Sequence, residues 1–269
     1  MKILHFSDLH IVPAGQRLFG LNPAQQLQQL IDHALQHHGD ADLCVITGDL
    51  THKGEVGAYE VLAEKLQQLP MPVQLLVGNH DDRHHFRSYF PDQSVDSHGF
   101  VQRIVDTDLY TLVFLDTLSV GSPEGELCAQ RLQWLSQAIA TSHKPILLFS
   151  HHPIMDLQFP SMDWIKLREH EEVMALIKQD NKVAYMFAGH VHRPAAGIWH
   201  GVPFATVSGA SHQHHLHFTQ TGASDSSLEP AGYGVISVLA HSITVHFQLA
   251  QNYARFAYQG PPLRLRAKT

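Results

Sequence analysis

Polar residues that could ligate metal ions follow five apolar runs of this sequence, at the point where each run ends. Asp-x-His and His-x-His pairs place alternate side chains on the same side of an extended segment, so both members of a pair can face one ion. A single pair of this kind is common by chance, but five polar sets that each follow an apolar run indicate a metal centre. The candidates are Asp8, His10, Asp49, Asn79, His80, His151, His152, His190 and His192.

These candidates offer nitrogen and oxygen donors and no thiolate. That chemistry disfavours a closed structural zinc site and suits Mn²⁺, iron or Zn²⁺ in an open catalytic site. The set exceeds the needs of one ion, and a carboxylate such as Asp49 can bridge two ions roughly 3.5–4 Å apart. Two divalent ions, the carboxylates of Asp8 and Asp49 and one bridging hydroxide sum to about +1, a charge that a phosphodiester monoanion neutralises. The sequence therefore predicts metal-assisted hydrolysis of an anionic phosphate ester.

The apolar runs predict the strands that would position these side chains. Gly78 lets the chain turn sharply after 72–77, and open α/β sheets bind ligands at such strand ends. Helices with one apolar face are expected from Asn22-Pro23 onward and at 55–69, 129–141 and 169–178, whereas 84–108 is less regular. Strand–loop–helix units that give way to hairpins predict a layered α/β fold, with two sheets face to face and helices outside. The expected strands are 1–6, 43–47, 72–77, 109–115, 145–149, 183–187, 202–207, 234–239 and 242–249.

The composition is that of an ordinary globular protein with an excess of histidine. The chain has 269 residues, of which 44% are hydrophobic, 16% are charged and 23 are histidine, and its formal charge is −7. No apolar run approaches the roughly 20 residues that cross a bilayer, and the N-terminus leads straight into a strand, so we expect a cytoplasmic protein with no membrane partner. The lack of a Lys/Arg-rich run disfavours broad binding to nucleic acid.

Two segments fall outside the main pattern of a single expected domain, 1–269. The segment 208–233 is rich in His, Ser, Gly and Thr, and we expect an ordered lid or pocket insertion there. Its histidine tract, 211–217, fits a pocket wall better than a third metal site. The tail, 250–269, fits either a frayed terminus or a contact in a homo-oligomer.

The polar blocks resemble those of the calcineurin-like metallophosphoesterases, and they follow in the same order over 7–192. The resemblance implies a four-layer αββα sandwich of two mixed β-sheets flanked by helices. The run from Gly48-Asp49 to Gly54, the run 79–83 and His151-His152-Pro153 are similar to the class III branch of bacterial cyclic-nucleotide and glycerophosphodiester phosphodiesterases. A related lipid A-pathway branch has arginine where His80 stands, which argues against that branch.

The resemblance assigns roles to individual residues. His80 would not ligate a metal but would stabilise or protonate the phosphoryl centre or leaving oxygen, with Asp81 fixing its tautomer. One ion would be held by Asp8, His10, Asp49 and His192, and the second by Asp49, Asn79, His151 and His190.

Several neighbouring residues have alternative interpretations. Asp81 could instead be an Asx-turn residue. Arg83 could grip a substrate phosphate or ribose, or it could pair with Asp82. His152 could line the pocket or support the adjacent ligand. Asn79 and His80 are expected to contact substrate together with Arg83 and His152.

The function that the resemblance implies is that of a dinuclear metal-dependent phosphodiesterase. Its substrate would be a small phosphodiester, such as 3′,5′-cyclic AMP or a glycerophosphodiester, attacked by a hydroxide held between two Mn²⁺, iron or Zn²⁺ ions. The alternative is a phosphomonoesterase or a nuclease on the same dimetal core, although the chain lacks the basic groove of a nuclease. Some relatives with eroded ligands act as scaffolds, but no ligand of the pattern is missing here.

Overall fold

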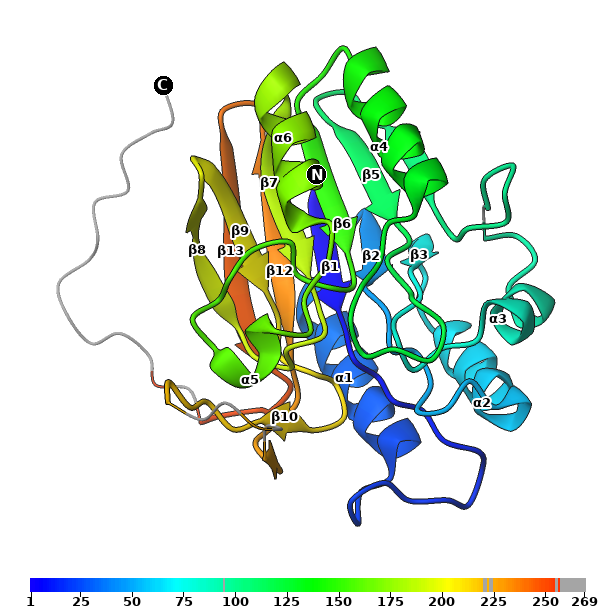
Figure 1. Ribbon diagram of the computed structural model, residues 1–269. Coiled ribbons are helices and arrows are strands. Elements are labelled where there is room, and N and C mark those ends of the chain that lie inside the picture. The colour runs from blue at the N-terminus through cyan, green and yellow to red at the C-terminus, as the bar shows by residue number, and fades with distance from the viewer. Residues whose placement is uncertain (94, 220–221, 223–224, 255, 257–269) are drawn as a thin grey trace, which may run out of the picture.

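Two β-sheets lie face to face in the middle of the molecule, and helices cover their outer faces (Figure 1). The computed structural model of the protein describes residues 1–93, 95–219, 222, 225–254 and 256. The first sheet has the strand order β13-β12-β1-β2-β3, with β1, β2 and β3 parallel and the other pairs antiparallel. Its strands are β1 (Lys2–Phe6), β2 (Leu43–Ile46), β3 (Val73–Leu75), β12 (Gly232–Leu239) and β13 (Ser242–Leu249).

The second sheet has the order β4-β5-β6-β7-β9-β8, in which the four central strands are parallel and the two outer strands are antiparallel. A separate short ribbon pairs β10 (Gln213–His214) with β11 (Ser226–Ser227). The strands of the second sheet are β4 (Arg103–Asp106), β5 (Thr111–Leu115), β6 (Ile146–Ser150), β7 (Val183–Ala188), β8 (Ala195–Trp199) and β9 (Val202–Thr206).

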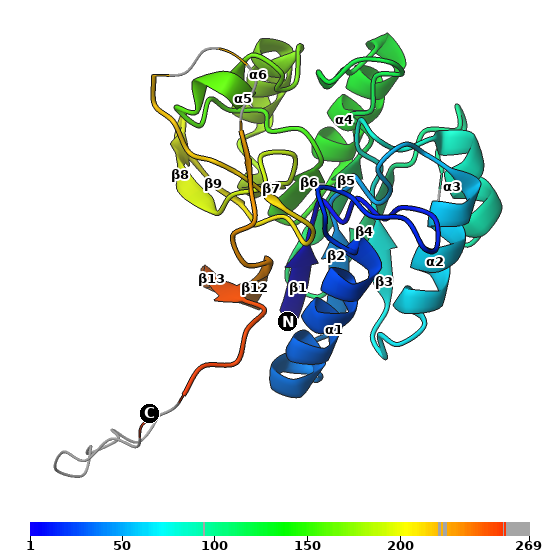
Figure 2. The same cartoon turned by 90° about the horizontal axis from the view of Figure 1, so that it is seen from below.

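Helices pack on both outer faces, as the view from below shows (Figure 2). On the first sheet lie α1 (Pro23–His38), α2 (Val56–Leu66) and α3 (Arg83–Tyr89), and on the second lie α4 (Ala129–Thr141) and α6 (His170–Asp180). Between the sheets, apolar side chains from both form a third core that includes Ile3, Val45, Phe149 and Phe187. The expected four-layer αββα sandwich is therefore confirmed.

Some elements differ from the sequence-based expectation. The stretch expected to be irregular contains α3 and β4, and the strand β8 and the one-turn helix α5 (Pro160–Asp163) were not predicted. Asp82 accounts for α3 because its carboxylate accepts a hydrogen bond from the His85 amide at 2.8 Å and caps the helix. The predicted start of α1 is confirmed, since Asn22 Oδ1 accepts from the Gln25 amide and Pro23 is the first helical residue.

Most of the expected tail, 255 and 257–269, lies outside the described residues, as do 220–221 and 223–224 of the expected lid. Within the described part of the chain, none of the helices has the length and apolarity that crossing a bilayer requires.

Candidate dimetal centre

The parallel strands of both sheets deliver the expected ligands to one place. The loop after β1 carries Asp8 and His10, the loop after β2 carries Asp49, and the loop after β3 carries Asn79. The second sheet contributes His151 after β6, and His190 and His192 after β7. The centre therefore joins the carboxyl ends of strands from both sheets.

The first cluster, site A, consists of Asp8, His10, Asp49 and His192. One potential ligand atom from each of these buried residues lies within 4.8 Å of the others. His10 Nε2 is 3.0 Å from His192 Nε2 and 3.5 Å from Asp49 Oδ2, and His192 Nε2 is 3.4 Å from Asp8 Oδ1. Two imidazole nitrogens and two carboxylates at this spacing match the donor set of a divalent ion.

The second cluster, site B, consists of Asp49, Asn79, His151 and His190. His151 Nε2 is 3.4 Å from Asp49 Oδ1 and 3.1 Å from Asn79 Oδ1. The rings of His151 and His190 have centroids 5.1 Å apart, and His190 Nε2 is buried without a hydrogen-bond partner. Asp49 thus turns one carboxylate oxygen toward site A and the other toward site B, as a bridging ligand does.

The backbone fixes which nitrogen of these histidines faces the cluster. His151 Nδ1 lies 2.7 Å from the Thr47 carbonyl oxygen and His192 Nδ1 lies 2.7 Å from that of His212. A carbonyl can only accept, so each Nδ1 carries a proton, and Nε2 is the nitrogen left to face an ion. Such outer hydrogen bonds are typical of metal-bound histidine, and together with the unpaired His190 Nε2 they show that the residues fit two divalent ions.

Burial and mutual charge set the protonation of the centre. Burial lowers the pKa of His10, His190 and His192 well below the usual histidine value, which keeps these rings neutral and able to ligate. Burial also raises the pKa of Asp8 to about 7. Against its own burial, His151 has its pKa raised to about 9 because the Asp49 carboxylate lies beside it. His10, His190 and His192 are therefore neutral nitrogen donors, and the Asp49 carboxylate is paired with His151.

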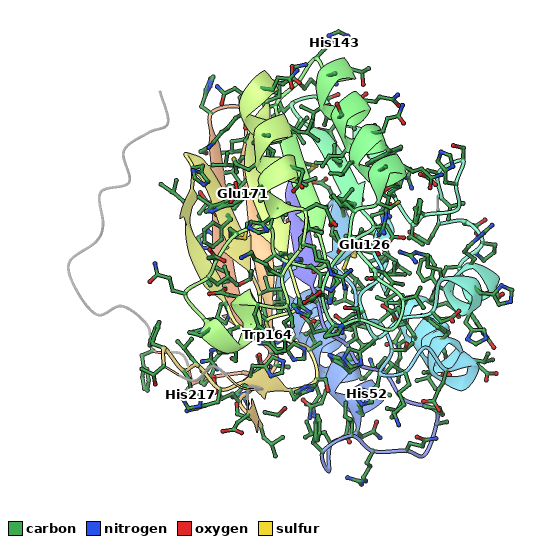
Figure 3. The ribbon with its side chains drawn as sticks, viewed as in Figure 1. His52, Glu126, His143, Trp164, Glu171 and His217 are labelled. Atoms are coloured by element: carbon green, nitrogen blue, oxygen red, sulfur yellow. The ribbon has the colours of Figure 1, made fainter. Side chains whose placement is uncertain are left out.

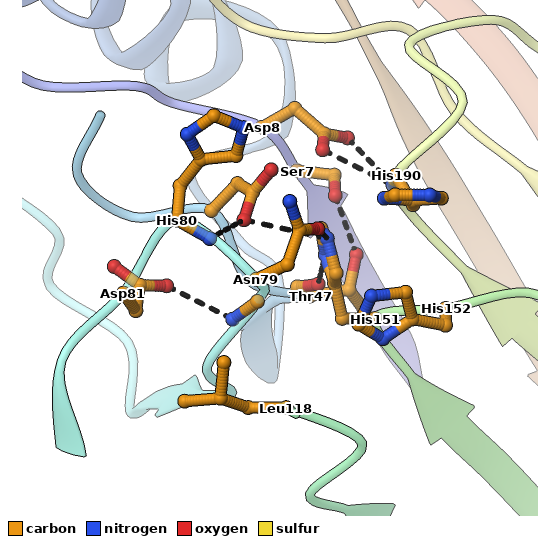
Figure 4. A network of polar contacts seen from close by, with 12 residues as sticks. Ser7, Asp8, Thr47, Asn79, His80, Asp81, Leu118, His151, His152 and His190 are labelled. Atoms are coloured by element: carbon orange, nitrogen blue, oxygen red, sulfur yellow. Dashed lines mark hydrogen bonds and ion pairs between the residues drawn. The ribbon is translucent and has the colours of Figure 1, made fainter. Parts of the chain in front are cut away.

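The loops that carry the candidate ligands have uncommon backbone conformations, and hydrogen bonds such as that between Asp8 and His190 join them (Figure 4). Asp8, His10, Asp49, His190 and His192 have φ angles of 55°, 45°, 47°, 69° and 49°, in the left-handed region that non-glycine residues rarely occupy. The Asp8 carboxylate accepts from the His190 amide, with both oxygens 3.1 Å from that nitrogen. A Cβ atom added at Gly78 would collide with Asp49 Oδ1, so the loops after β2 and β3 can approach only with glycine there.

His80 lies beside the centre and is held from two sides. Its amide donates to Asp49 Oδ1 at 2.9 Å, and its Nδ1 lies 2.7 Å from the His52 carbonyl oxygen. The carbonyl fixes the proton on Nδ1 and leaves Nε2 as the nitrogen that can exchange a proton. The His52 ring stacks on His80 at 5.1 Å between centroids and 17° between planes.

The expectation that Asp81 fixes the tautomer of His80 is wrong. Its carboxylate accepts from the amides of Leu50, Thr51 and Gly78 at 2.9–3.0 Å and from the Tyr59 hydroxyl at 3.0 Å. Burial raises the pKa of Asp81 to about 6 in spite of these donors. Asp81 therefore ties the loop after β2 to the loop after β3 and acts on the centre through the backbone.

Two residues expected to contact substrate are placed elsewhere. Arg83 donates two hydrogen bonds to Asp116, from Nε at 2.7 Å and from Nη2 at 2.8 Å. Its described ion pair is therefore not with Asp82, and it is not among the residues that line the cavity. His152 is fully buried; its Nδ1 is 2.8 Å from Thr117 Oγ1, and its ring lies 4.6 Å from that of His190. His152 does not line the cavity and its ring packs against that of His190, which favours the second of the two interpretations left open.

A cavity of about 350 Å³ opens beside the two clusters. Asn79 and His80 line it, as expected, and so do His212, His214 and Ser226 from the segment predicted to shape the pocket. Sequence reasoning missed His52, whose Nδ1 lies 3.3 Å from His10 Nδ1. It also missed Phe19 and the wall formed by Ser161, Met162, Trp164 and Ile165.

Several proteins of similar sequence are named as phosphodiesterases. The chain is 38% identical to a "Probable cyclic nucleotide phosphodiesterase" of Rhodopseudomonas palustris, over 97% of this chain and 94% of that protein. It is 30% identical to a "cAMP/cGMP dual specificity phosphodiesterase" of Mycobacterium tuberculosis, over 77% of this chain and 66% of that one. The "3',5'-cyclic adenosine monophosphate phosphodiesterase CpdA" of Escherichia coli is 28% identical, over 75% of this chain and 73% of its own length.

A solved structure and a family model agree with these relatives. The fold matches a dimetal phosphatase from Danio rerio with a TM-score of 0.69 and 15% identity, over 93% of this chain and 96% of that chain. Residues 1–194, which include all the ligands of sites A and B, match the family model described as calcineurin-like phosphoesterase. The chain belongs to the calcineurin-like phosphoesterase family.

Proposed function

We propose that the protein is a dinuclear metal-dependent phosphodiesterase that hydrolyses a small phosphodiester, with a cyclic nucleotide such as 3′,5′-cyclic AMP as the preferred substrate. The observation that carries the proposal is the position of Asp49, whose two oxygens face two nitrogen- and oxygen-rich clusters with His80 beside them. The named activities of the relatives in Rhodopseudomonas palustris, Mycobacterium tuberculosis and Escherichia coli support the choice of substrate.

When bound, two divalent ions would acidify a water molecule and withdraw charge from the phosphoryl oxygens. Asp8, His10, Asp49 and His192 would hold one ion, and Asp49, Asn79, His151 and His190 the other. The protein's own part is to keep these donors fixed: the carbonyls of Thr47 and His212 orient His151 and His192. Asn79 also lines the cavity, where its amide group can contact a substrate oxygen.

His80 is the residue placed to move a proton. Because the His52 carbonyl holds the proton on Nδ1, a second proton on Nε2 is the one that His80 can give to the departing alkoxide. Its amide bond to Asp49 Oδ1 ties the position of this group to that of the bridging carboxylate. A positioned acid of this kind contributes a factor of about 10²–10⁴ to the rate.

The finer features of the proposal follow from the same chemistry. The mixed nitrogen and oxygen donors suit Mn²⁺, iron or Zn²⁺ as the native pair. We propose a single cytoplasmic domain in which the segment 208–233 shapes the substrate pocket, since His212 and His214 line the cavity.

The test is hydrolysis of bis-p-nitrophenyl phosphate, cyclic AMP, a glycerophosphodiester, a phosphomonoester and single-stranded DNA by the Mn²⁺-loaded protein. We expect cyclic AMP to be the best natural substrate, EDTA to abolish turnover, and His80→Ala to lower kcat by about 10²-fold or more. Turnover that survives chelation, or a His80→Ala variant as fast as the wild type, would show that the mechanism is wrong. Preference for the monoester or for DNA would reject the diesterase assignment.

A further inference from the structure

The cavity has a second wall that the metal chemistry does not use. It is formed by Phe19, from the loop between β1 and α1, and by Met162, Trp164 and Ile165, from α5 and the residues after it. Trp164 and Phe19 are 61% and 55% exposed, and the Phe19 ring packs against those of His212 and His52, so a large part of each side chain stays open to a ligand. Figure 3 places Trp164 and His52 toward the same end of the molecule, opposite His143. Exposed aromatic groups beside a concave site mark a binding surface.

The turn that carries Trp164 is fixed. The Asp163 carboxylate accepts from the amides of Leu157 and Phe159 at 2.8 and 2.9 Å and closes the chain around α5. Phe159 and Met162 pack in a small core with Val191, the residue between the ligands His190 and His192. The position of Trp164 is therefore tied to the dimetal centre through packed side chains.

The charge of the cavity restricts what this wall can hold. Among the described lining residues, Asp49 is the only carboxylate and none is lysine or arginine. A second phosphate would find no cation apart from the metal ions, and an ammonium head group would find no free carboxylate. A flat, uncharged group suits this wall, because such groups stack on aromatic side chains. Aromatic faces also bind quaternary ammonium groups, and glycerophosphocholine tests that alternative.

Two polar atoms along the same cavity lack partners in the protein. Ser161 Oγ and His214 Nδ1 are buried, belong to residues that line the cavity, and make no hydrogen bond within the described structure. Buried polar atoms without partners are rare, and at a ligand site they mark groups that the ligand satisfies. A nucleobase or ribose offers the edge atoms that would do so.

We propose that Trp164 and Phe19 form an aromatic subsite that holds the base of a cyclic nucleotide, in the cavity that Ser161 and His214 also line. This inference rests on the proposed phosphodiesterase function and adds to it the residues that select the substrate. Trp164 contacts the base, not the phosphorus, so its loss acts on substrate affinity more than on the chemical step.

Kinetics of matched variants test the subsite in the Mn²⁺-loaded enzyme. We expect Trp164→Ala to raise KM for cyclic AMP at least about fivefold, the effect of one lost base stack, while Trp164→Phe keeps most of the affinity. For glycerophosphocholine, which has no base, the change in KM should stay below about twofold on the same principle. Ile198→Ala, an equally apolar exposed position of β8 that does not line the cavity, serves as the control.

If Trp164→Ala raised KM equally for cyclic AMP and glycerophosphocholine, the subsite would be overturned, because Trp164 would then support the fold or bind a cationic head group. An unchanged KM for both substrates would overturn it as well.

Binding of adenosine to the metal-free protein, measured by equilibrium dialysis, separates base binding from catalysis. Wild type and Trp164→Phe should bind adenosine, and Trp164→Ala should bind it at least about fivefold more weakly. If the wild type hydrolyses no diester, the proposed function fails, whereas the adenosine measurement still decides the subsite.

Discussion

His52 shows how a single residue outside the ligand set can control two members of the centre. Its carbonyl fixes the proton of His80, its ring stacks on the His80 ring, and its Nδ1 lies 3.3 Å from His10 Nδ1. If His10 binds an ion through Nε2, its Nδ1 carries a proton that His52 can accept. Outer hydrogen bonds of this kind raise the basicity of a ligand and fix the plane of its ring.

The first prediction concerns this imidazole. We expect His52→Ala to weaken binding of the site A ion by about 10–100-fold and to lower kcat, because His10 loses its acceptor and His80 loses its stacking partner. Metal affinity measured by calorimetry on the EDTA-stripped protein, together with kcat, checks this. His143→Ala, an exposed position at the far end of the molecule, is the control. Unchanged metal affinity in His52→Ala would contradict the assignment.

The convergence of the candidate ligands could be predicted from the sequence because their residue types and their positions after apolar strands are local properties. Asp8, His10, Asp49, Asn79, His151, His190 and His192 converge as the pattern indicated. The partners of Asp81 and Arg83 could not be predicted in the same way. Each interacts with residues that are distant in the chain, and charge pairing alone does not single out Asp116 from the other acidic residues.

At the level of secondary structure, long elements could be predicted from local sequence and short ones could not. The principal strands and the four longer helices have apolar periodicity of their own, so the sandwich could be predicted from the chain. The helices α3 and α5 and the ribbon of β10 and β11 are too short to carry a periodic signal. They form because of capping groups such as Asp82 and because the rest of the fold surrounds them.

Arg83 connects two of these elements. It is the first residue of α3, on the first sheet, and it donates to Asp116, directly after β5 of the second sheet. Arg83 Nη2 also donates to the Leu118 carbonyl at 2.6 Å, and Asp116 accepts from the amides of Val101 and Leu118. Asp116 is fully buried, which makes the loss of its bidentate partner costly.

The second prediction follows from this ion pair. Arg83→Met should lower the free energy of unfolding by roughly 2–3 kcal/mol, since a buried carboxylate loses a charge-assisted partner but keeps its amide donors. KM for the diester should change by less than about twofold because Arg83 does not line the cavity. Urea denaturation and steady-state kinetics measure both effects, with the exposed Arg87→Met of the same helix as control. A large rise in KM with unchanged stability would restore the substrate-binding interpretation.

Considered as a whole, the molecule buries histidine in its core as well as in its site. His5 lies between the sheets, where its ring packs at nearly right angles to those of Phe149 and Phe187, and its Nε2 lies 2.9 Å from Thr47 Oγ1. Burial lowers the pKa of His5 from 6.5 to about 3. The native state therefore keeps this ring neutral in a pH range where the unfolded chain binds a proton.

The third prediction is the acid sensitivity that results. Below pH 6.5 the unfolded state takes up a proton that native His5 does not, so stability falls as the pH drops from 6.5 toward 3, by about 1.4 kcal/mol per pH unit from this residue. In EDTA, the free energy of unfolding should fall less between pH 6 and pH 5 for His5→Gln than for the wild type, and the difference should be about 1.4 kcal/mol. Urea denaturation at the two pH values measures it, and His143→Gln should leave the slope unchanged. An equal fall in the free energy of unfolding for wild type and His5→Gln would contradict the prediction.

If Asp49 bridges two metal ions, as proposed, it makes the two halves of the centre thermodynamically inseparable. One of its oxygens lies 3.5 Å from His10 and the other 3.4 Å from His151, so occupancy of either cluster redistributes charge on a group that the other requires. Linkage demands that each ion alter the affinity of its neighbour by the same factor. A substitution confined to one cluster will then shift the binding isotherm of both. Variants such as His10→Ala or His151→Ala thus report on a coupled pair, and a double-mutant cycle is needed to divide their effects.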